Sequence, residues 1–285
     1  MVNKMNKKYN ITLASPQGFC GGVKRAIKLL NDAINNKNIK KPIYMLGSIV
    51  HNNNVTNSFI EKGVKLITKD DIKDISEGTI VVSAHGVSPK IIKEIENKNL
   101  DIIDTTCEKI REMHNLINSK VKEGYQIAFL GKATHDETLG VLGLSDNVKL
   151  IENDSITNYQ DKTLLVCQTT LCFDEVENKF LFLKEKYPNL ELANEICNAT
   201  KTRQSGAINA SKNADLVLVV GDKTSNNCNT LVEVIKINAC KNTYMISSIS
   251  DLENIDFTNI KNITITSAAS TPDEDVIDIL NFLNK

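Results

Sequence analysis

Three cysteines recur along the chain at nearly equal intervals, each between a run typical of a β-strand and a run typical of an α-helix. Cys20, Cys107 and Cys197 are separated by 87 and 90 residues. A chain that repeats strand, turn and helix at a fixed period folds as copies of one supersecondary element. The period therefore predicts three pseudo-repeated α/β units, residues 1–104, 105–194 and 195–285.

Polar side chains follow the apolar strand-like runs of each predicted unit in the same register. Ligand-binding residues of parallel α/β sheets lie where strands end and helices begin. We therefore expect a trefoil of three units around one central site. The polar residues are His51, His135 and Ser225 after one set of strands, and His85, Thr169 and Ser270 after the other.

The composition is that of an ordinary globular protein. The 285 residues are 41% hydrophobic, and the net charge of −1 comes from interspersed acidic and basic residues, so we expect no nucleic-acid partner. No apolar run reaches the roughly 20 residues that cross a bilayer, and residues 1–8 lack the apolar core of a signal peptide. Seven cysteines, an odd number, argue against a disulfide framework. We expect a soluble, cytoplasmic protein with reduced thiols and no membrane partner.

The repeated cysteines stand at predicted helix starts, where the helix dipole favours a thiolate. Gly18, Gly21 and Gly22 flank Cys20 and leave room for a bulky group against its sulfur. A structural zinc site normally takes four ligands, often in close pairs, and such pairs are absent from this sequence. Three thiolates without a fourth suit a [4Fe–4S] cluster with one iron open to substrate. For any one of these cysteines, a buried helix-start thiol is the alternative.

A carboxylate stands beside a histidine in His135-Asp136-Glu137, just ahead of a predicted short helix, 138–142. In a partly dry cavity, such a carboxylate can have its pKa raised toward neutrality and donate a proton. We expect the charge of Asp136 to raise the Glu137 pKa further. The alternative is an acidic helix N-terminus favoured by the helix dipole.

A polar loop at 221–229 follows a strand-like run and leads into a predicted helix, 230–238. Its hydroxyl and amide groups suit phosphate oxygens, although an ordinary polar turn has the same composition. Thr271 and Glu274 are spaced as a capping box for the last helix. Cysteines, histidines, hydroxyls and one carboxylate together predict a reductive site for a small phosphorylated molecule.

Short motifs are spread over nearly the whole chain, from Ile11 to the last helix. They are residues 16–23 with Arg25-Ala26, then 49–52, 84–87, 104–107, 135–137, 168–170, Ile196-Cys197 with Thr200, Arg203-Gln204 and 225–229. In this order and spacing they resemble the motifs of the 4-hydroxy-3-methylbut-2-enyl diphosphate reductase (IspH/LytB) family. Several short motifs in the right order are far more specific than any one of them.

The resemblance implies reductive dehydroxylation of 4-hydroxy-3-methylbut-2-enyl diphosphate to isopentenyl and dimethylallyl diphosphates, the last step of the non-mevalonate isoprenoid pathway. It implies that Cys20, Cys107 and Cys197 hold a [4Fe–4S] cluster, with a ferredoxin or flavodoxin as electron donor. It also implies that Glu137 supplies a proton with help from Thr169 and His135. The implied substrate-binding residues are His51, His85, His135, Thr169, Ser225, Asn226, Asn227 and Ser270.

Four positions depart from the family pattern. Glu108 and Asp136 stand where the family usually has Pro, and Asn226 where it has Ser. The stretch Ser267-Ala268-Ala269-Ser270 lacks the Gly of the family's usual Ala-Gly-Ala-Ser. These departures concern the details and rate of the reaction more than the reaction itself.

Two other interpretations remain open. A non-catalytic iron–sulfur or zinc sensor on the same fold would keep the cysteines but would not need Glu137, Thr169 or the phosphate-binding side chains. A cofactor-free α/β protein that binds phosphosugars would leave the three equivalent cysteines unexplained. The presence of all the other site residues disfavours the sensor.

Overall fold

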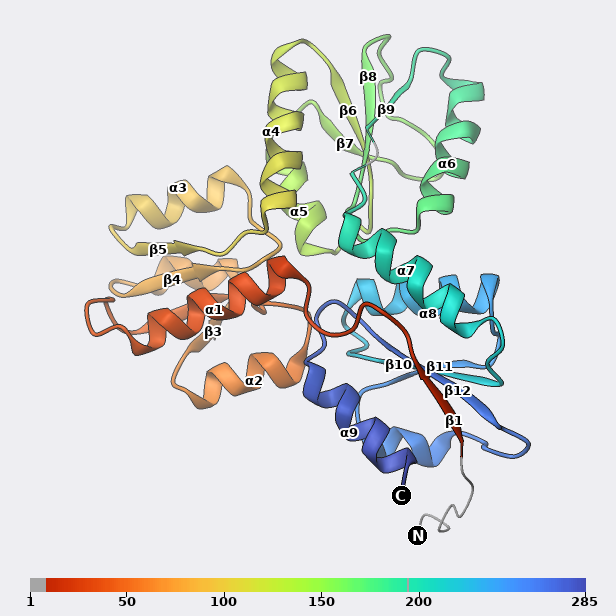
Figure 1. Cartoon of the computed structure of the whole chain (residues 1–285). Coiled ribbons are helices and arrows are strands. Elements are labelled where there is room, and N and C mark those ends of the chain that lie inside the picture. Colours follow the sequence, from red (N-terminus) through yellow and green to blue (C-terminus); the bar gives the residue numbers. More distant parts are fainter. Residues whose placement is uncertain (1–8, 194) are drawn as a thin grey trace. The chain divides into compact units, whose positions relative to one another are not determined.

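The computed structural model describes residues 9–193 and 195–285 and contains, within them, three parallel β-sheets of four strands each (Figure 1). The chain divides into two compact regions. We call Gly21–Cys197 the middle region, and Met1–Cys20 with Asn198–Lys285 the terminal region. The α/β class predicted from the sequence is confirmed.

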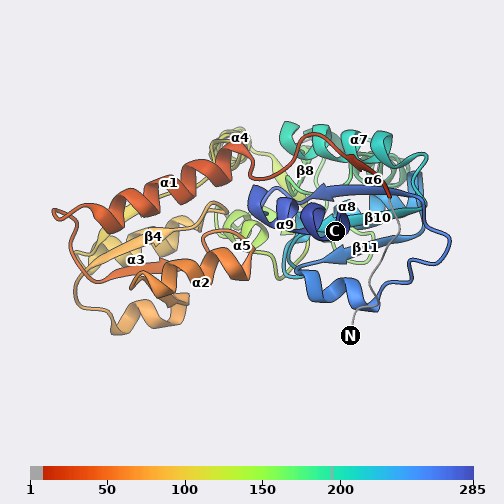
Figure 2. The same cartoon turned by 60° about the horizontal axis from the view of Figure 1, so that its bottom comes forward.

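The first sheet of the middle region has the strand order β3-β2-β4-β5. Its central strand β4 is apolar and fully buried, as expected of a parallel strand that is covered on both faces. Figure 2 shows α1 along one face, and Ile80 packs with Ile72 and Ile95 of η1 and α3. The elements are α1 (Gly21–Asn35), β2 (Ile43–Leu46), α2 (Asn53–Glu61), β3 (Lys65–Ile67), η1 (Lys69–Asp74), β4 (Thr79–Val82), α3 (Pro89–Asn97) and β5 (Asp101–Asp104).

The second sheet of the middle region has the order β7-β6-β8-β9. Side chains alternate between the two faces of a strand, so Ile127 and Phe129 pack with α4 and α5 while Ala128 packs with Leu183 of α6. Both faces are therefore covered by helices. The elements are α4 (Glu108–Lys122), β6 (Gln126–Leu130), α5 (Asp136–Leu142), β7 (Val148–Leu150), β8 (Thr163–Cys167), α6 (Phe173–Lys186) and β9 (Glu191–Ala193).

The terminal region holds the third sheet, with the order β1-β12-β10-β11. The same alternation directs Val217 and Val219 toward α7 and α8, and Leu216 and Leu218 toward α9 and η2. The elements are β1 (Asn10–Leu13), α7 (Asn198–Ser211), β10 (Leu216–Val220), α8 (Asn226–Asn238), β11 (Thr243–Ile246), η2 (Ile249–Asn254), β12 (Asn262–Ser267) and α9 (Asp273–Leu283).

The N-terminal strand departs from the predicted first unit. β1 pairs in parallel with β12, with Ile11 beside Ile263, so residues 10–13 complete the third sheet. β5 and β9 occupy the same edge position, next to β4 and β8. The strand before each repeated cysteine is thus the edge strand of a sheet, and for Cys20 that sheet lies at the other end of the chain. The boundaries after residues 104 and 194 stay predictions.

Two details at helix starts also differ from the sequence predictions. Helix α8 begins at Asn226 rather than at residue 230, because the Ser225 hydroxyl accepts a hydrogen bond from the Cys228 backbone N at 3.3 Å. Thr271 does not cap α9, since its hydroxyl donates to the Val220 carbonyl at 3.0 Å and Pro272 is the N-cap.

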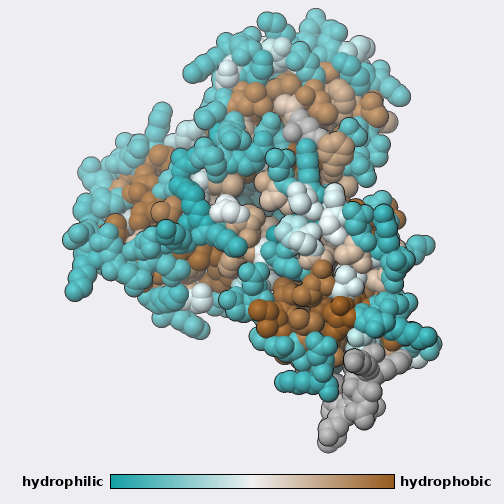
Figure 3. Space-filling model, viewed as in Figure 1, coloured by the Kyte–Doolittle hydropathy of each residue, from teal (hydrophilic) through white to brown (hydrophobic). Residues whose placement is uncertain are grey.

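Hydrophilic side chains cover most of the face shown in Figure 3. An apolar patch lies over α9, where Ile277 is 51% exposed. Within residues 9–193 and 195–285, no helix has both the length and the apolar character needed to cross a membrane.

Candidate active site

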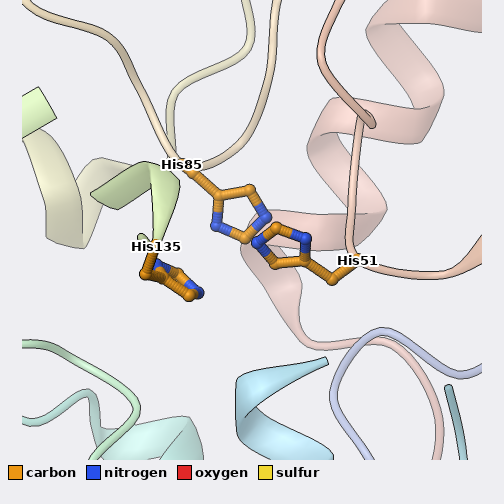
Figure 4. A group of neighbouring side chains, drawn as sticks. All are labelled: His51, His85 and His135. Atoms are coloured by element: carbon orange, nitrogen blue, oxygen red, sulfur yellow. The ribbon is translucent and has the colours of Figure 1, made fainter. Parts of the chain in front are cut away.

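Three histidines from the two sheets of the middle region form one cluster (Figure 4). His51 follows β2, His85 follows β4, and His135 is the N-cap of α5. The rings of His51 and His85 stack with centroids 4.2 Å apart, and His135 stands edge-on at 4.9 Å from His51 and 5.5 Å from His85. One ring nitrogen of each lies within 4.8 Å of the others, close enough for one anion or metal ion to contact all three.

Two histidines of this cluster are neutral at neutral pH. Burial, followed by the charges of His51 and Lys132, lowers the pKa of His135 to about 4. Burial and the two neighbouring histidines also hold the pKa of His85 well below its ordinary value. The Nδ1 atom of His135 accepts the backbone N–H of Glu137 at 3.2 Å, so the proton of the neutral ring is on Nε2. His135 therefore offers a donor to an incoming ligand without a full charge.

Asp136 brings a carboxylate to the edge of the histidine cluster. Its Oδ2 lies 3.9 Å from His51 Nε2, and its side chain is 45% exposed. The residue is the first of α5, where the helix dipole favours a negative charge. A carboxylate at this place attracts a protonated His51 and opposes an anion bound to the cluster.

Glu137 is the buried carboxyl group of the site. It is 1% exposed, and its two oxygens accept hydrogen bonds from the Thr169 backbone N at 2.7 Å and the Thr169 hydroxyl at 3.0 Å. Burial raises the Glu137 pKa to about 7, although the two hydrogen bonds act in the opposite direction. The pKa is raised as the sequence predicts, but the cause is desolvation rather than the charge of Asp136.

Gln168 forms hydrogen bonds in the loops that follow β6 and β8, next to Glu137 and Thr169. Its Oε1 accepts the backbone N of Lys132 at 3.0 Å, and its Nε2 donates to the Thr170 hydroxyl at 3.0 Å. The side chain is fully buried, so the bond to Lys132 fixes the ends of β6 and β8 relative to each other, while the bond to Thr170 orders the loop after β8. The sequence shows Gln168 in a motif with Thr169 but does not reveal this role, because Lys132 follows a different strand.

The three repeated cysteines make the same backbone contact. Each backbone N donates to a carbonyl in the loop after a central strand: Cys107 to Ala84 at 3.0 Å, Cys197 to Thr169 at 3.1 Å, and Cys20 to Ala269 at 3.1 Å. Cys107 is the N-cap of α4, while Cys20 and Cys197 directly precede α1 and α7. The repeat seen in the sequence is therefore also a repeat of local structure.

Exposure and thiol pKa divide five of the cysteines into two groups. Cys20, Cys107 and Cys197 are partly exposed cysteines at helix starts, the setting in which thiols serve as metal ligands. Burial raises the pKa of Cys167 to about 11 and that of Cys228 to about 12, so both are inert thiols. The first group fits an iron–sulfur cluster in donor type and number.

A further cysteine and a further histidine lie outside these groups. Cys172 is partly exposed and is the N-cap of α6. His114 lies on α4, and its Nε2 atom is buried without a hydrogen-bond partner. Burial lowers the pKa of His114, so it is a neutral side chain in the helix packing.

The predicted phosphate-binding residues of the terminal region gather at the carboxyl ends of β10 and β12, which are adjacent parallel strands. Ser225 is the N-cap of α8, and its hydroxyl accepts a hydrogen bond from the Ser270 hydroxyl at 3.3 Å. Asn226 and Asn227 form the first turn of α8 rather than a loop, with Asn226 buried and Asn227 partly exposed. A helix N-terminus with buried hydroxyls is suited to a phosphate group.

Comparisons with known proteins agree on one family. A family model described as LytB protein matches residues 11–284. The chain is 36% identical over 285 residues to the 4-hydroxy-3-methylbut-2-enyl diphosphate reductase of Halalkalibacterium halodurans, covering 97% of this chain and 91% of that protein. It is 38% identical over 280 residues to the protein of that name from Lysinibacillus sphaericus, covering 95% and 87%.

A solved structure shares the fold. The E-1-hydroxy-2-methyl-but-2-enyl-4-diphosphate reductase of Plasmodium falciparum is similar with a TM-score of 0.90 and 31% identity, covering 98% of this chain and 89% of that one. A second solved structure, of (E)-4-hydroxy-3-methyl-but-2-enyl diphosphate reductase, has a TM-score of 0.67 and 27% identity. The chain belongs to the LytB family of 4-hydroxy-3-methylbut-2-enyl diphosphate reductases.

Proposed function

We propose that this protein reduces 4-hydroxy-3-methylbut-2-enyl diphosphate to isopentenyl and dimethylallyl diphosphates, the terminal step of the non-mevalonate isoprenoid pathway. In the reaction the allylic C–O bond breaks, two electrons and two protons enter, one C–H bond forms and one water leaves. The observation that carries the proposal is the buried Glu137, bonded to Thr169 and poised to donate a proton near neutral pH. Family membership names the substrate class.

Cys20, Cys107 and Cys197 would hold a [4Fe–4S] cluster. The support is their partly exposed thiols at helix starts and their shared backbone contact. Such a cluster supplies the two electrons, one at a time, from a small donor of the ferredoxin or flavodoxin type. Free thiols of this kind suit a reducing compartment such as the cytoplasm.

Glu137 would deliver the proton that turns the departing hydroxyl into water. With a pKa of about 7, a large fraction of the carboxyl groups is protonated at neutral pH. The Thr169 hydroxyl, 3.0 Å from the carboxyl oxygen, would relay or orient that proton. His135, whose Nδ1 accepts the backbone N–H of Glu137, would assist from the other side of this residue. A positioned general acid of this type contributes about 10²–10⁴-fold to a rate.

The diphosphate would be held by the histidine cluster and by the start of α8. The members of this set are His51, His85, His135, Ser225, Asn226, Asn227 and Ser270. Neutral imidazoles and hydroxyls donate hydrogen bonds to phosphate oxygens, and the α8 dipole favours their charge. Fixing the diphosphate orients the allylic alcohol and so lowers the entropic part of the barrier.

A non-catalytic iron–sulfur or zinc sensor is the second candidate. The cysteines alone suit a sensor as well as an enzyme. A sensor has no use for a buried carboxyl whose pKa is about 7, because burying that group costs stability. The Glu137–Thr169 pair therefore favours the reductase.

The test is the Glu137→Gln variant under anaerobic conditions. Gln keeps the shape and the acceptor for the Thr169 N–H but lacks the acidic proton. We expect an unchanged iron content and visible spectrum, with turnover reduced at least about 100-fold. Glu61→Gln, which removes an exposed carboxylate at the end of α2, is the matched control and should keep full turnover. Normal turnover of the Glu137→Gln protein would exclude Glu137 as the proton donor.

A further inference from the structure

The loop that carries Cys20 is fixed within the terminal region by buried hydrogen bonds. Gly18 N donates to the Ser267 hydroxyl at 2.9 Å, and Cys20 N donates to the Ala269 carbonyl at 3.1 Å. Both acceptors lie at the end of β12 or just beyond it. The position of Cys20 is therefore set by the third sheet, although α1, which follows it, belongs to the middle region.

Arg203, on α7, ties this loop to the rest of the terminal region. The residue is 2% exposed. Its Nη1 atom donates to the Pro16 carbonyl at 3.1 Å and to the Ser267 carbonyl at 2.7 Å. Its Nη2 atom donates to the Gly18 carbonyl at 2.7 Å. One planar guanidinium thus joins α7, the Cys20 loop and β12, a geometry that lysine cannot reproduce.

Close packing leaves the loop little freedom. Gly206, one turn after Arg203 on α7, lies so near the Ser15 carbonyl that a Cβ there would collide with it. Gly18 has a φ of +66°, and a Cβ on it would collide with the carboxylate of Asp273. The loop before Cys20 therefore has one well-defined conformation, and Arg203 lies at its centre.

The charge of Arg203 has a second consequence. The three acceptors are neutral carbonyl oxygens, so the hydrogen bonds of Nη1 and Nη2 do not cancel the positive charge of the guanidinium. The buried charge acts on the partly exposed Cys20 and on the exposed carboxylate of Asp273, which offsets part of it. A cation at this place favours additional negative charge near Cys20.

We propose that Arg203 is a positioning residue for the redox centre: it fixes the loop that presents Cys20, and its buried charge makes the centre easier to reduce. The proposal rests on the cluster assigned above under the proposed function. It adds a residue that contacts neither substrate nor the reacting atoms. Reduction adds one negative charge, so a nearby buried cation stabilises the reduced form more than the oxidised form.

The test compares Arg203→Lys and Arg203→Met with Lys212→Met, which removes one exposed positive charge just beyond the end of α7. The first readout is hydrogen exchange at the backbone amides of residues 17–20 in the full chain as purified, whatever its iron content. The second is the midpoint potential of the reconstituted protein, from a titration followed by electron paramagnetic resonance.

Arg203→Met should speed amide exchange at residues 17–20. At the wild-type midpoint potential, it should also lower the ratio of reduced to oxidised protein about tenfold. Arg203→Lys keeps the charge but loses the planar fork, so exchange should accelerate while the midpoint stays close to that of the wild type. Lys212→Met should change neither readout. If Arg203→Met does not hold a cluster, Arg203→Lys still tests the positioning role.

If Arg203→Met has the midpoint potential of the wild type, the charge of Arg203 does not make the centre easier to reduce. If both variants exchange at the wild-type rate, Arg203 does not fix the loop that presents Cys20. A wild-type protein that binds no iron would instead contradict the proposed function. The exchange data would then still decide whether Arg203 fixes the loop.

Discussion

Replacing Glu137 with Gln should make the stability of the protein less dependent on pH. Burial raises the pKa of this carboxyl from 4.5 to about 7. Because the folded-state pKa lies above the unfolded-state value, the folded protein keeps a proton that the unfolded chain releases. Its contribution to stability is therefore complete below pH 4.5 and is lost as the pH rises through about 7. For a group 1% exposed, the full loss corresponds to about 3 kcal/mol.

The Gln side chain is neutral at every pH and fits the same space beside Thr169. Between pH 5 and pH 8, the variant should gain about 2–3 kcal/mol in unfolding free energy relative to the wild type. Urea unfolding across this range measures the difference, with Glu61→Gln as the control that should follow the wild type. A difference between variant and wild type that does not change with pH would refute a buried, proton-holding carboxyl.

Three further predictions concern other parts of the site. Cys107→Ser should lose most of the bound iron while Cys240→Ser, a buried thiol in a core cluster, keeps it; equal iron in the two variants would contradict the ligand assignment. Asp136→Asn removes a carboxylate 3.9 Å from His51 and should tighten competitive inhibition by pyrophosphate about two- to tenfold, discounted for its partial exposure; weaker inhibition would show that Asp136 supports anion binding. Gly18→Ala, at a φ of +66°, should lower thermal stability by more than about 1 kcal/mol and reduce iron content, and wild-type values of both would contradict the tight loop.

The repeat allowed much of the fold to be predicted from the sequence. Polar residues after apolar strand-like runs predicted the histidine cluster, because parallel strands deliver such residues to one edge. The pairing of β1 with β12 could not be predicted in this way, since Ile11 and Ile263 are distant in sequence and nothing local marks one as the partner of the other. The repeat predicted that a strand precedes Cys20, but it did not show which sheet that strand joins.

The cause of the raised Glu137 pKa could not be predicted from the sequence either. The sequence places Asp136 beside Glu137, so a charge effect was the natural expectation. The pKa of Glu137 depends instead on how completely the fold removes it from water, which is a property of tertiary packing. The role of Arg203 was hidden for a similar reason, because its partners are carbonyl groups, which the identity of a side chain does not reveal.

The most direct test of the central claim is anaerobic turnover of 4-hydroxy-3-methylbut-2-enyl diphosphate with reduced methyl viologen, on protein whose iron and sulfide have been quantified. We expect about four irons per chain and formation of isopentenyl and dimethylallyl diphosphates. A full cluster without turnover would favour the sensor. Turnover by protein that holds no iron would contradict the assignment of Cys20, Cys107 and Cys197 as cluster ligands.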